Sequence, residues 1–384
     1  MHVLHVTNTL HKGGAETHLL DLTSGLKRLG VTCEVAFLRS NVAGGSTDLR
    51  EAFEASGVRT HYLACEGPYD LRAPARLRRL LAARHWDILH SHLPRCDAAA
   101  AVCRLLDPRQ TWISTLHHPY DSDDDAYAGR RWIPAMAPMW RVADGVIAVS
   151  ESLRQWAIVR LGLAPGSVHT IMHGVDVAAI PASIGAASAG APMRSRYRIG
   201  TIGRYERRKG HDTLIRSMVP ILTQCPDAEL LLAGHDPWGY GATLERLIDE
   251  LGIRKHVRLV GYVSDKDTFF GDIDVFAFAS RSEGFGIVVL EAMAAGKAVV
   301  VSNIAPLNEI VQPGTSGLVA RSEDADDFAA AVVALFRDPV LLERIGREGR
   351  CRVEAEFSRV RMVERTLEYY HTVLVRRRTA APQR

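Results

Sequence analysis

Two basic side chains in the segment GRYERRKG (203–210) are of the types that stabilise a departing anion. Arg204 and Lys209 come directly after an apolar run that predicts a strand, and loops after the strands of an open parallel sheet point into the ligand crevice. A fixed guanidinium and ammonium there stabilise the negative charge that develops when a bond to a phosphate breaks. The glycines at both ends favour a shaped anion-binding loop, whereas Arg207 and Arg208 are expected to be solvated.

Two acids, Glu283 and Glu291, stand eight residues apart in EGFGIVVLE (283–291). The spacing crosses a glycine-containing loop and the start of a predicted helix, which puts the carboxylates on the order of 10 Å apart. This is about the span from a sugar ring to a ribose across a pyrophosphate, so one pair of acids could contact both ends of a nucleotide sugar. Two solvated acids are the alternative interpretation.

Glycines also stand where two predicted helices begin. Those of EGFG allow the backbone N–H groups of Phe285, Gly286 and Ile287 to approach a sugar or its phosphates at a helix N-terminus. Gly13 and Gly14 follow the first predicted strand and open the first predicted helix, whose unpaired N–H groups and positive end attract a phosphate. An ordinary turn is the alternative for this glycine pair.

Five segments in a fixed order resemble the retaining glycosyltransferases of family 4, which have the GT-B architecture. The first half of the chain contributes GGAE (13–16) and LHH (116–118). The second half contributes GRYERRKG, EGFGIVVLE and EIVQPGTSGLV (309–319). Because order and spacing agree over nearly the whole chain, the chain is identified as a member of this group.

The resemblance implies roles for individual residues. Glu291 is implied to accept hydrogen bonds from the ribose hydroxyls, and Glu283 to bind hydroxyls of the transferred sugar. The loop containing Gly13 and Gly14 is implied to cover the donor from the opposite domain, and His117 to lie near the reacting sugar. For His117 a satisfied polar residue at a strand end is the alternative. The family reaction implies retention by same-face attack, in which the departing phosphate takes the acceptor proton.

The pattern of the chain predicts an α/β fold with two Rossmann-like domains, because short β-branched runs alternate with helical periods and 384 residues exceed one core. The GT-B resemblance implies that these domains face each other across a cleft. Domain boundaries are expected at 1–182 and 193–357, separated by the linker PASIGAASAGAP (181–192). The C-terminal helix (358–384) is expected to cross back to the N-terminal domain. Strands are predicted at 2–6, 31–37, 87–90, 111–116, 145–149, 169–172, 198–202, 229–233, 257–260, 274–278, 298–301 and 318–319.

Composition excludes several other classes of protein. A formal net charge of +3 is too small to indicate a nucleic-acid partner, and six cysteines without a CxxC pair indicate neither a disulfide framework nor a zinc ribbon. No apolar run is long enough for a transmembrane helix, and the first residues do not form a secretory signal, so a cytoplasmic location is expected. The basic helical segment 71–86 could contact anionic lipid at the inner face of the membrane, with an ordinary solvent-facing helix as the alternative.

No cofactor or metal is expected besides the nucleotide-sugar donor. His90, His92 and Cys96 offer no fourth ligand at a defined spacing, and the acidic run YDSDDDAY (120–127) is expected to be a solvated surface loop. The resemblance implies a glycolipid or polysaccharide acceptor and a hexosyltransferase reaction. A nucleotide-sugar epimerase, a phosphorylase on the same fold and a noncatalytic nucleotide-sugar-binding protein remain as alternatives.

Overall fold

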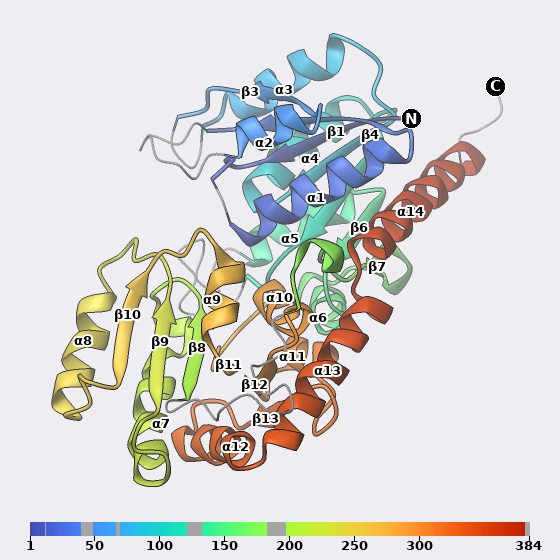
Figure 1. Cartoon of the computed structure of the whole chain (residues 1–384). Helices are drawn as coiled ribbons and strands as arrows, with labels where there is room; N and C mark the ends of the chain where they lie inside the picture. The colour runs from blue at the N-terminus through green and yellow to red at the C-terminus, as the bar shows by residue number, and fades with distance from the viewer. Residues whose placement is uncertain (12, 40–48, 67–69, 121–132, 183–196, 381–384) are drawn as a thin grey trace. The chain divides into compact units, whose positions relative to one another are not determined.

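The computed structural model describes the chain except for residues 12, 40–48, 67–69, 121–132, 183–196 and 381–384 (Figure 1). The chain forms two compact units. Unit 1 comprises Met1–Gly174 together with Arg359–Arg384, and unit 2 comprises Val175–Ser358. Each unit contains one parallel β-sheet packed against helices, so the predicted α/β class with two Rossmann-like domains is confirmed.

The sheet of unit 1 has seven parallel strands in the order β3-β2-β1-β4-β5-β6-β7. Because β1 and β4 are neighbours at the centre, the carboxyl ends of β1, β4 and β5 come together at one edge of the sheet. The strands are β1 (His2–Thr7), β2 (Thr32–Phe37), β3 (Arg59–Tyr62), β4 (Ile88–His92), β5 (Trp112–Leu116), β6 (Gly145–Ala148) and β7 (Val168–Thr170).

The helices of unit 1 pack against the two faces of this sheet. One face carries Leu4, Leu89 and Trp112, whose apolar cluster includes α3 and α4 residues such as Leu77 and Ala100. The other face lies against α1 and the last helix of the chain. The helices are α1 (Gly14–Arg28), α2 (Arg50–Ala55), α3 (Ala73–Ala82), α4 (Pro94–Leu106), α5 (Ile133–Arg141), α6 (Glu151–Leu161) and α14 (Arg359–Ala380).

The C-terminal helix α14 returns to unit 1, as the sequence predicts. Val363 packs so closely on α1 that a Cβ at Gly25 would lie 2.4 Å from its methyl group. Tyr370 is fully buried in the same apolar cluster as Ile88 and Ile113 of the sheet. The helix therefore completes the core on this face, which explains why 20 or more residues at the end of the second sequence half belong to the first unit.

Unit 2 has a six-stranded parallel sheet in the order β10-β9-β8-β11-β12-β13. Its interior strands are almost continuously apolar because helices bury both faces. The strands are β8 (Arg198–Ile202), β9 (Glu229–Ala233), β10 (Val257–Gly261), β11 (Val275–Phe278), β12 (Ala298–Ser302) and β13 (Leu318–Ala320). The helices are α7 (His211–Gln224), α8 (Gly241–Glu250), α9 (Lys266–Asp272), α10 (Ile287–Ala294), α11 (Ala305–Ile310), α12 (Ala325–Arg337) and α13 (Pro339–Glu356).

The chain passes between the units at Gly174/Val175 and at Ser358/Arg359. The first passage lies ahead of the expected linker 181–192, because Val175 bridges to Ser358 and its N–H donates to the carbonyl of Phe357. These contacts tie residues 175–180 to unit 2, and most of the expected linker lies outside the described residues.

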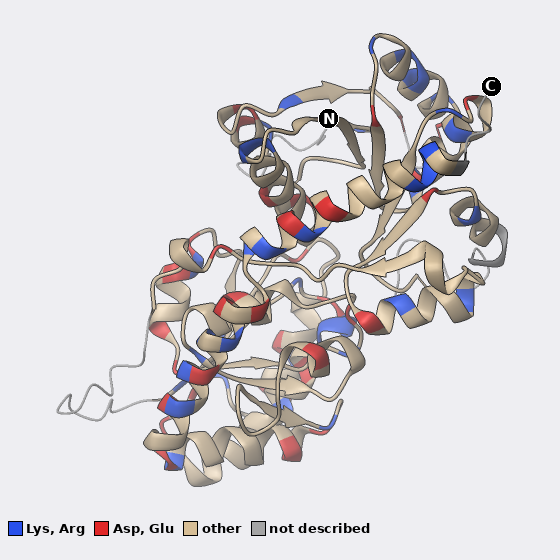
Figure 2. Ribbon diagram, turned by 90° about the vertical axis from the view of Figure 1, so that its right-hand side faces the viewer, with Lys and Arg blue, Asp and Glu red and all other residues tan. Residues whose placement is uncertain are grey.

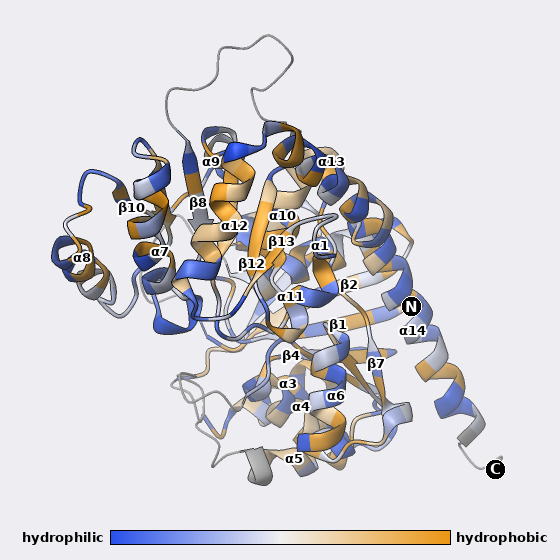
Figure 3. Cartoon of the chain, turned by 90° about the horizontal axis from the view of Figure 1, so that it is seen from below, coloured by the Kyte–Doolittle hydropathy of each residue, from blue (hydrophilic) through white to orange (hydrophobic). Residues whose placement is uncertain are grey.

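Charged and apolar residues separate as expected for α/β units. Lys, Arg, Asp and Glu colour the helices and loops, while the strands are mostly free of them (Figure 2). Apolar residues concentrate in interior strands such as β12 (Figure 3). Among the described residues, no helix has both the length and the apolar character that crossing a bilayer requires.

Candidate functional site

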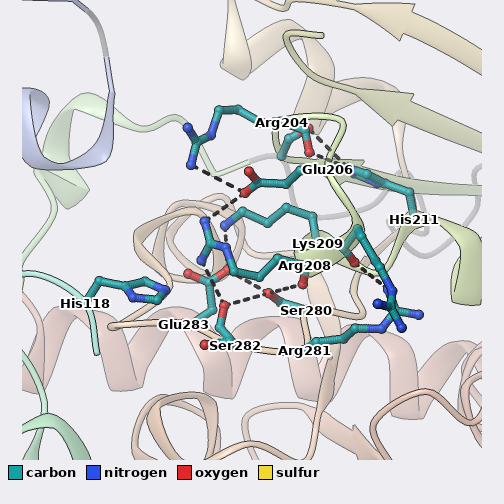
Figure 4. A network of polar contacts seen from close by, with 12 residues as sticks. His118, Arg204, Glu206, Arg208, Lys209, His211, Ser280, Arg281, Ser282 and Glu283 are labelled. Carbon is teal, nitrogen blue, oxygen red and sulfur yellow. Dashed lines mark hydrogen bonds and ion pairs between the residues drawn. The ribbon is translucent and has the colours of Figure 1, made fainter. Parts of the chain in front are cut away.

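The centre of the site in unit 2 is an ion pair between two residues that the sequence singles out. Lys209 Nζ lies 2.5 Å from Glu283 Oε1, and the side chains are only 14% and 9% exposed (Figure 4). Ser280 Oγ donates to the same oxygen at 2.8 Å. Burial alone would raise the pKa of Glu283, but the charges of Lys209 and Arg208 and these hydrogen bonds lower it to about 2. Glu283 is therefore an anion at neutral pH.

Lys209 and Glu283 meet although 74 residues separate them in sequence. Strands β8 and β11 are neighbours, so the loops that follow them start side by side at the carboxyl edge of the sheet. The carbonyl of Arg208 accepts hydrogen bonds from the N–H of Arg281 at 2.8 Å and from Ser280 Oγ at 3.1 Å. These bonds fix the two loops to each other.

Gly210 is required by this arrangement of loops. Its φ is +67°, a left-handed conformation that favours glycine, and a Cβ would lie 1.9 Å from the carbonyl oxygen of Ala279. The glycine thus lets the first loop pass directly over the end of β11 before α7 begins at His211. The expectation of a shaped loop at 203–210 agrees with this geometry.

Arg208 corrects one expectation from the sequence. Its side chain is only 11% exposed, pairs with Glu206 at 2.7 Å and donates to the carbonyl of Ser282 at 3.0 Å. It is therefore part of the polar network, because it holds the loop before Glu283 and adds positive charge beside that carboxylate. Arg207 is exposed, as expected.

Arg204 lies at the outer part of the same loop. Its guanidinium is 5.2 Å from the ring centroid of Trp238 and 3.4 Å from Glu206, and its side chain is 47% exposed. Its guanidinium shares the Glu206 carboxylate with Arg208, whose side chain in turn holds the loop before Glu283 (Figure 4). Arg204 is thus accessible to a ligand, whereas Lys209 is anchored.

His211 supports the loop from beneath, a role that sequence reasoning missed. Its Nε2 lies 3.2 Å from the carbonyl oxygen of Gly203 and 3.0 Å from that of Arg204, so it donates to both. Burial lowers its pKa to about 4, which keeps it neutral. The only sequence signal is its place directly after the glycine that ends the loop.

Glu291 is paired within unit 2 by a residue that the sequence did not indicate. It lies on α10, and both of its carboxylate oxygens are 2.6 Å from Lys266 Nζ. Lys266 is the first residue of α9 and follows β10 by a short loop. A ribose would therefore meet a carboxylate whose orientation is already set by an ammonium group.

Helix α10 begins where the glycine loop predicts. Gly286 is its N-cap with a φ of +111°, and no side chain caps the helix. A Cβ at Gly286 would approach Leu307 to 2.8 Å, so the position needs glycine for space as well as conformation. Ile287 opens the helix, and Phe285 is buried with its ring 6.2 Å from that of Phe357. This geometry presents backbone N–H groups at a positive helix end.

The remaining predicted site residues belong to unit 1. Gly13 is the N-cap of α1 without a side-chain cap, and Gly14 is the first helical residue. His117 follows β5, and burial lowers its pKa to about 4. Its Nε2 lies 3.1 Å from His92 Nδ1.

A possible metal-binding group differs from the one considered in the sequence. Ring nitrogens of His5, His90 and His92 lie within 4.8 Å of one another, while Cys96 is not part of this group. Both nitrogens of His90 are bonded to hydroxyls, at 2.6 Å to Tyr370 and 2.7 Å to Thr115 (the latter on β5). Residues 121–127 of the acidic run lie outside the described part of the chain.

Two parallel-sheet α/β units, of seven and six strands, match the fold of GT-B enzymes. Residues 12–179 match "Glycosyltransferase Family 4" and residues 191–352 match "Glycosyl transferases group 1". The two matches together cover most of the chain. The protein therefore belongs to the group 1, family 4 glycosyltransferases and is a nucleotide-sugar-dependent transferase.

Known relatives agree with this assignment. The chain is 28% identical over 373 residues to the phosphatidyl-myo-inositol mannosyltransferase of Mycolicibacterium smegmatis, covering 91% of this chain and 89% of the relative. It is 28% identical over 242 residues to a lipopolysaccharide core biosynthesis mannosyltransferase of Rhizobium leguminosarum, covering 61% and 66% of the two chains. The fold matches the Anabaena protein HepE, solved with UDP and glucose, with a TM-score of 0.82 at 19% identity and coverage of 97% and 100%.

Proposed function

We propose that this enzyme transfers a hexose from a nucleotide-diphosphate sugar to a glycolipid or cell-envelope polysaccharide acceptor, with retention of anomeric configuration. The buried Lys209–Glu283 pair is the observation that carries the proposal. A buried cation beside a buried anion suits a ligand that has two adjacent parts. The cation would contact the negative diphosphate, and the anion would accept hydrogen bonds from the neutral, hydroxyl-rich sugar.

The pair divides the work of binding and bond cleavage. An ammonium group has three N–H donors. Lys209 uses one on Glu283 and can direct others to the diphosphate oxygens, whose charge grows as the sugar–phosphate bond breaks. Lys209 and Ser280 both bond to Oε1 of Glu283, so in the described part of the chain Oε2 is the oxygen left to accept from sugar hydroxyls. Glu283 then orients the sugar and is not the nucleophile.

Other predicted residues complete the donor site in the proposal. Arg204 is exposed beside the loop and would contact the outer phosphate oxygens. The N–H groups at Gly286 and Ile287 would bind the diphosphate at the start of α10, and Glu291 the ribose hydroxyls. Gly13 and Gly14 would contribute the N-terminus of α1, and His117 would contact the reacting sugar from unit 1. Retention by same-face attack leaves the departing phosphate to take the acceptor proton.

The relatives suggest which substrates to test first. Both relatives named above are mannosyltransferases, one acting on phosphatidyl-myo-inositol and one in lipopolysaccharide core biosynthesis. We therefore propose that mannose is the first donor sugar to test and that the acceptor is linked to a lipid. An acceptor of this type also suits peripheral contact with the inner face of the membrane through residues 71–86.

The ion pairs of residues 71–86 indicate which arginines are available to contact lipid. Within the segment, Arg72 pairs with Asp70 at 2.8 Å, and Arg84 pairs with Glu34. Arg78 and Arg79 are exposed and make no ion pair among the described residues, so they are the candidates for lipid phosphates.

The decisive experiment combines binding with turnover. A thermal-shift screen against UDP, GDP, ADP and their sugars identifies the nucleotide, because a ligand that binds only the folded protein raises Tm. Release of nucleoside diphosphate is then measured with and without acceptor. Acceptor-dependent release supports transfer, and acceptor-independent release would indicate a hydrolase. Conversion of the donor to an epimeric nucleotide sugar without net release would indicate an epimerase, and a requirement for inorganic phosphate would indicate a phosphorylase. Binding without any turnover would indicate a noncatalytic protein.

A further inference from the structure

One face of the unit 1 sheet carries buried histidines from three neighbouring strands. His5 lies on β1 directly opposite His90 on β4, and His92 follows two residues later on the same face. Their side chains are 0%, 0% and 1% exposed. His117 comes two residues after Thr115, the register partner of His92, so strand alternation brings it to this face as well.

Three of these histidines form a continuous chain of ring contacts. His5 Nδ1 lies 3.2 Å from His92 Nε2, and His92 Nδ1 lies 3.1 Å from His117 Nε2. The two terminal nitrogens, His5 Nε2 and His117 Nδ1, are buried and have no hydrogen-bond partner among the described residues. The chain therefore runs from the sheet interior to the residue expected beside the sugar.

All three rings are neutral near pH 7. Burial lowers the pKa of His5 to about 3 and that of His117 to about 4. Burial and the neighbouring histidines lower the pKa of His92 well below its ordinary value. A neutral imidazole has one N–H donor and one bare acceptor nitrogen. Each N···N contact therefore needs one donor and one acceptor, which forces both hydrogen bonds to point in the same direction.

Two directions satisfy this rule, and the unpartnered ends decide between them. If the bonds run inward, an N–H group of His5 is left without an acceptor inside the sheet. If they run outward, the N–H group without an acceptor lies on His117 Nδ1 instead. His5 is fully buried, whereas His117 is partly exposed, so only His117 can receive an acceptor from a bound ligand, and this favours the outward direction. In that direction His5 Nδ1–H donates to His92 Nε2, and His92 Nδ1–H donates to His117 Nε2.

We propose that His5 and His92 are positioning residues that fix the tautomer of His117, so that His117 presents its Nδ1–H as a hydrogen-bond donor to an oxygen of the bound substrate. This inference rests on the proposed function, which brings the sugar to His117. A sugar hydroxyl or ring oxygen supplies the acceptor that this nitrogen lacks within the protein. The packing of His18 and His173 against the His117 ring, both with centroids 5.5 Å away, limits its rotation.

A metal ion explains the same residues less well. His90 already uses both nitrogens on hydroxyl groups, and a divalent ion here would bring two positive charges into the sheet interior. Among the described residues no carboxylate is bonded to His5, His90 or His92 to balance them.

The test reads the tautomer directly by ¹⁵N NMR of histidine-labelled protein without substrate. The His117 signals are assigned by their loss in His117→Gln. In the wild type, Nδ1 is expected to be the protonated nitrogen. In His5→Leu the row of hydrogen-bonded histidines loses its first donor, so His117 is expected to become a mixture of tautomers. In His5→Asn the amide replaces the Nδ1 donor, and the single tautomer is expected to return.

Turnover of the same variants adds a second measurement. The kcat of His5→Leu is expected to fall about tenfold with little change in the KM for the donor, and His5→Asn to recover most of it. His90→Leu is the matched control, because His90 has the same burial and strand face but stands outside the chain. It is expected to lower Tm while leaving the His117 tautomer unchanged.

Three results would overturn the inference: a proton on His117 Nε2 in the wild type, an unchanged tautomer in His5→Leu, or one equivalent of metal bound per chain in the purified protein. Full turnover by His117→Gln would instead refute the role of His117 in the proposed function. The NMR result separates the two, because it is obtained without substrate.

Discussion

Acidification should destabilise unit 1 selectively, because its interior holds an unusual number of histidines. Lowering the pH from 7.5 to 5.5 protonates histidines in the unfolded chain, where their pKa is about 6.5. In the folded protein, burial keeps the pKa of each member of this set below that value. The set is His5, His18, His90, His92, His117 and His173.

Whether the unfolding free energy rises or falls with pH depends on which state, folded or unfolded, binds more protons. For a group whose folded pKa is lowered, the stabilisation is fully present above the unfolded pKa and is lost as the pH falls towards the folded pKa. Each histidine that stays neutral costs about 1.4 kcal/mol of unfolding free energy over these two pH units. Six such groups amount to on the order of 8 kcal/mol.

Asp97 has the opposite effect, because its contribution to the unfolding free energy increases as the pH falls. It is fully buried, and burial raises its pKa to about 7 despite hydrogen bonds from Ser91, Ser114 and Trp140. Its folded state gains a proton as the pH falls through 7, which returns about 2 kcal/mol. The net loss is on the order of 6 kcal/mol, comparable to the whole stability of many domains.

Urea unfolding followed by tryptophan fluorescence at pH 7.5 and 5.5 measures this loss. Five of the six tryptophans lie in unit 1, so the signal reports mainly on that unit. His5→Leu should reduce the pH dependence by about one histidine's share, whereas His85→Asn, at an exposed position, should not change it. An unfolding free energy that differs by less than about 1 kcal/mol between the two pH values would refute the reasoning.

Five further outcomes are expected. Lys209→Met should cut kcat by a factor corresponding to about 2–4 kcal/mol of barrier and should lower the unfolding free energy by about 3–5 kcal/mol, because it leaves the Glu283 charge buried and unpaired. Adding Glu283→Gln to that variant should restore much of the stability, measured by urea titration, but none of the activity. Gly210→Ala should lower Tm markedly in a thermal melt, because its Cβ would meet the carbonyl of Ala279 at 1.9 Å. Glu291→Gln should weaken nucleotide binding about tenfold, measured by calorimetry, while leaving the affinity for the free base unchanged. EDTA should leave turnover nearly unchanged.

Specific results would contradict these predictions. Full activity in Lys209→Met would remove its assignment to the leaving group, and an unchanged Tm in Gly210→Ala would contradict the close packing of the two loops. Activity abolished by EDTA and restored by Mn²⁺ would reverse the expectation that no metal is needed. Arg207→Ala is a useful control, because Arg207 is exposed on the same loop.

Much of the fold could be predicted from the sequence, because its signals are local. Apolar runs of strand length lie within a residue or two of the observed strands, and glycines end or begin helices where a left-handed residue or close packing is needed. The missed strand β3 (Arg59–Tyr62) reads RTHY, which lacks an apolar run because it lies at the edge of the sheet. Motif order was enough to assign the class of enzyme.

The pairing of site residues was decided by tertiary structure. The sequence marks Lys209 and Glu283 separately, but only the adjacency of β8 and β11 joins them. The fold likewise brings Lys266, at the start of α9, to Glu291 on α10. The histidine chain likewise depends on strand order.

His5, His92 and His117 carry no common motif, since His5 lies on β1, His92 on β4 and His117 directly after β5. They become one system because β1, β4 and β5 are adjacent and in register, so that alternate side chains share one buried face. Sequence periodicity determines which face of a strand a side chain occupies, whereas the identity of its neighbour depends on which strand forms hydrogen bonds beside it.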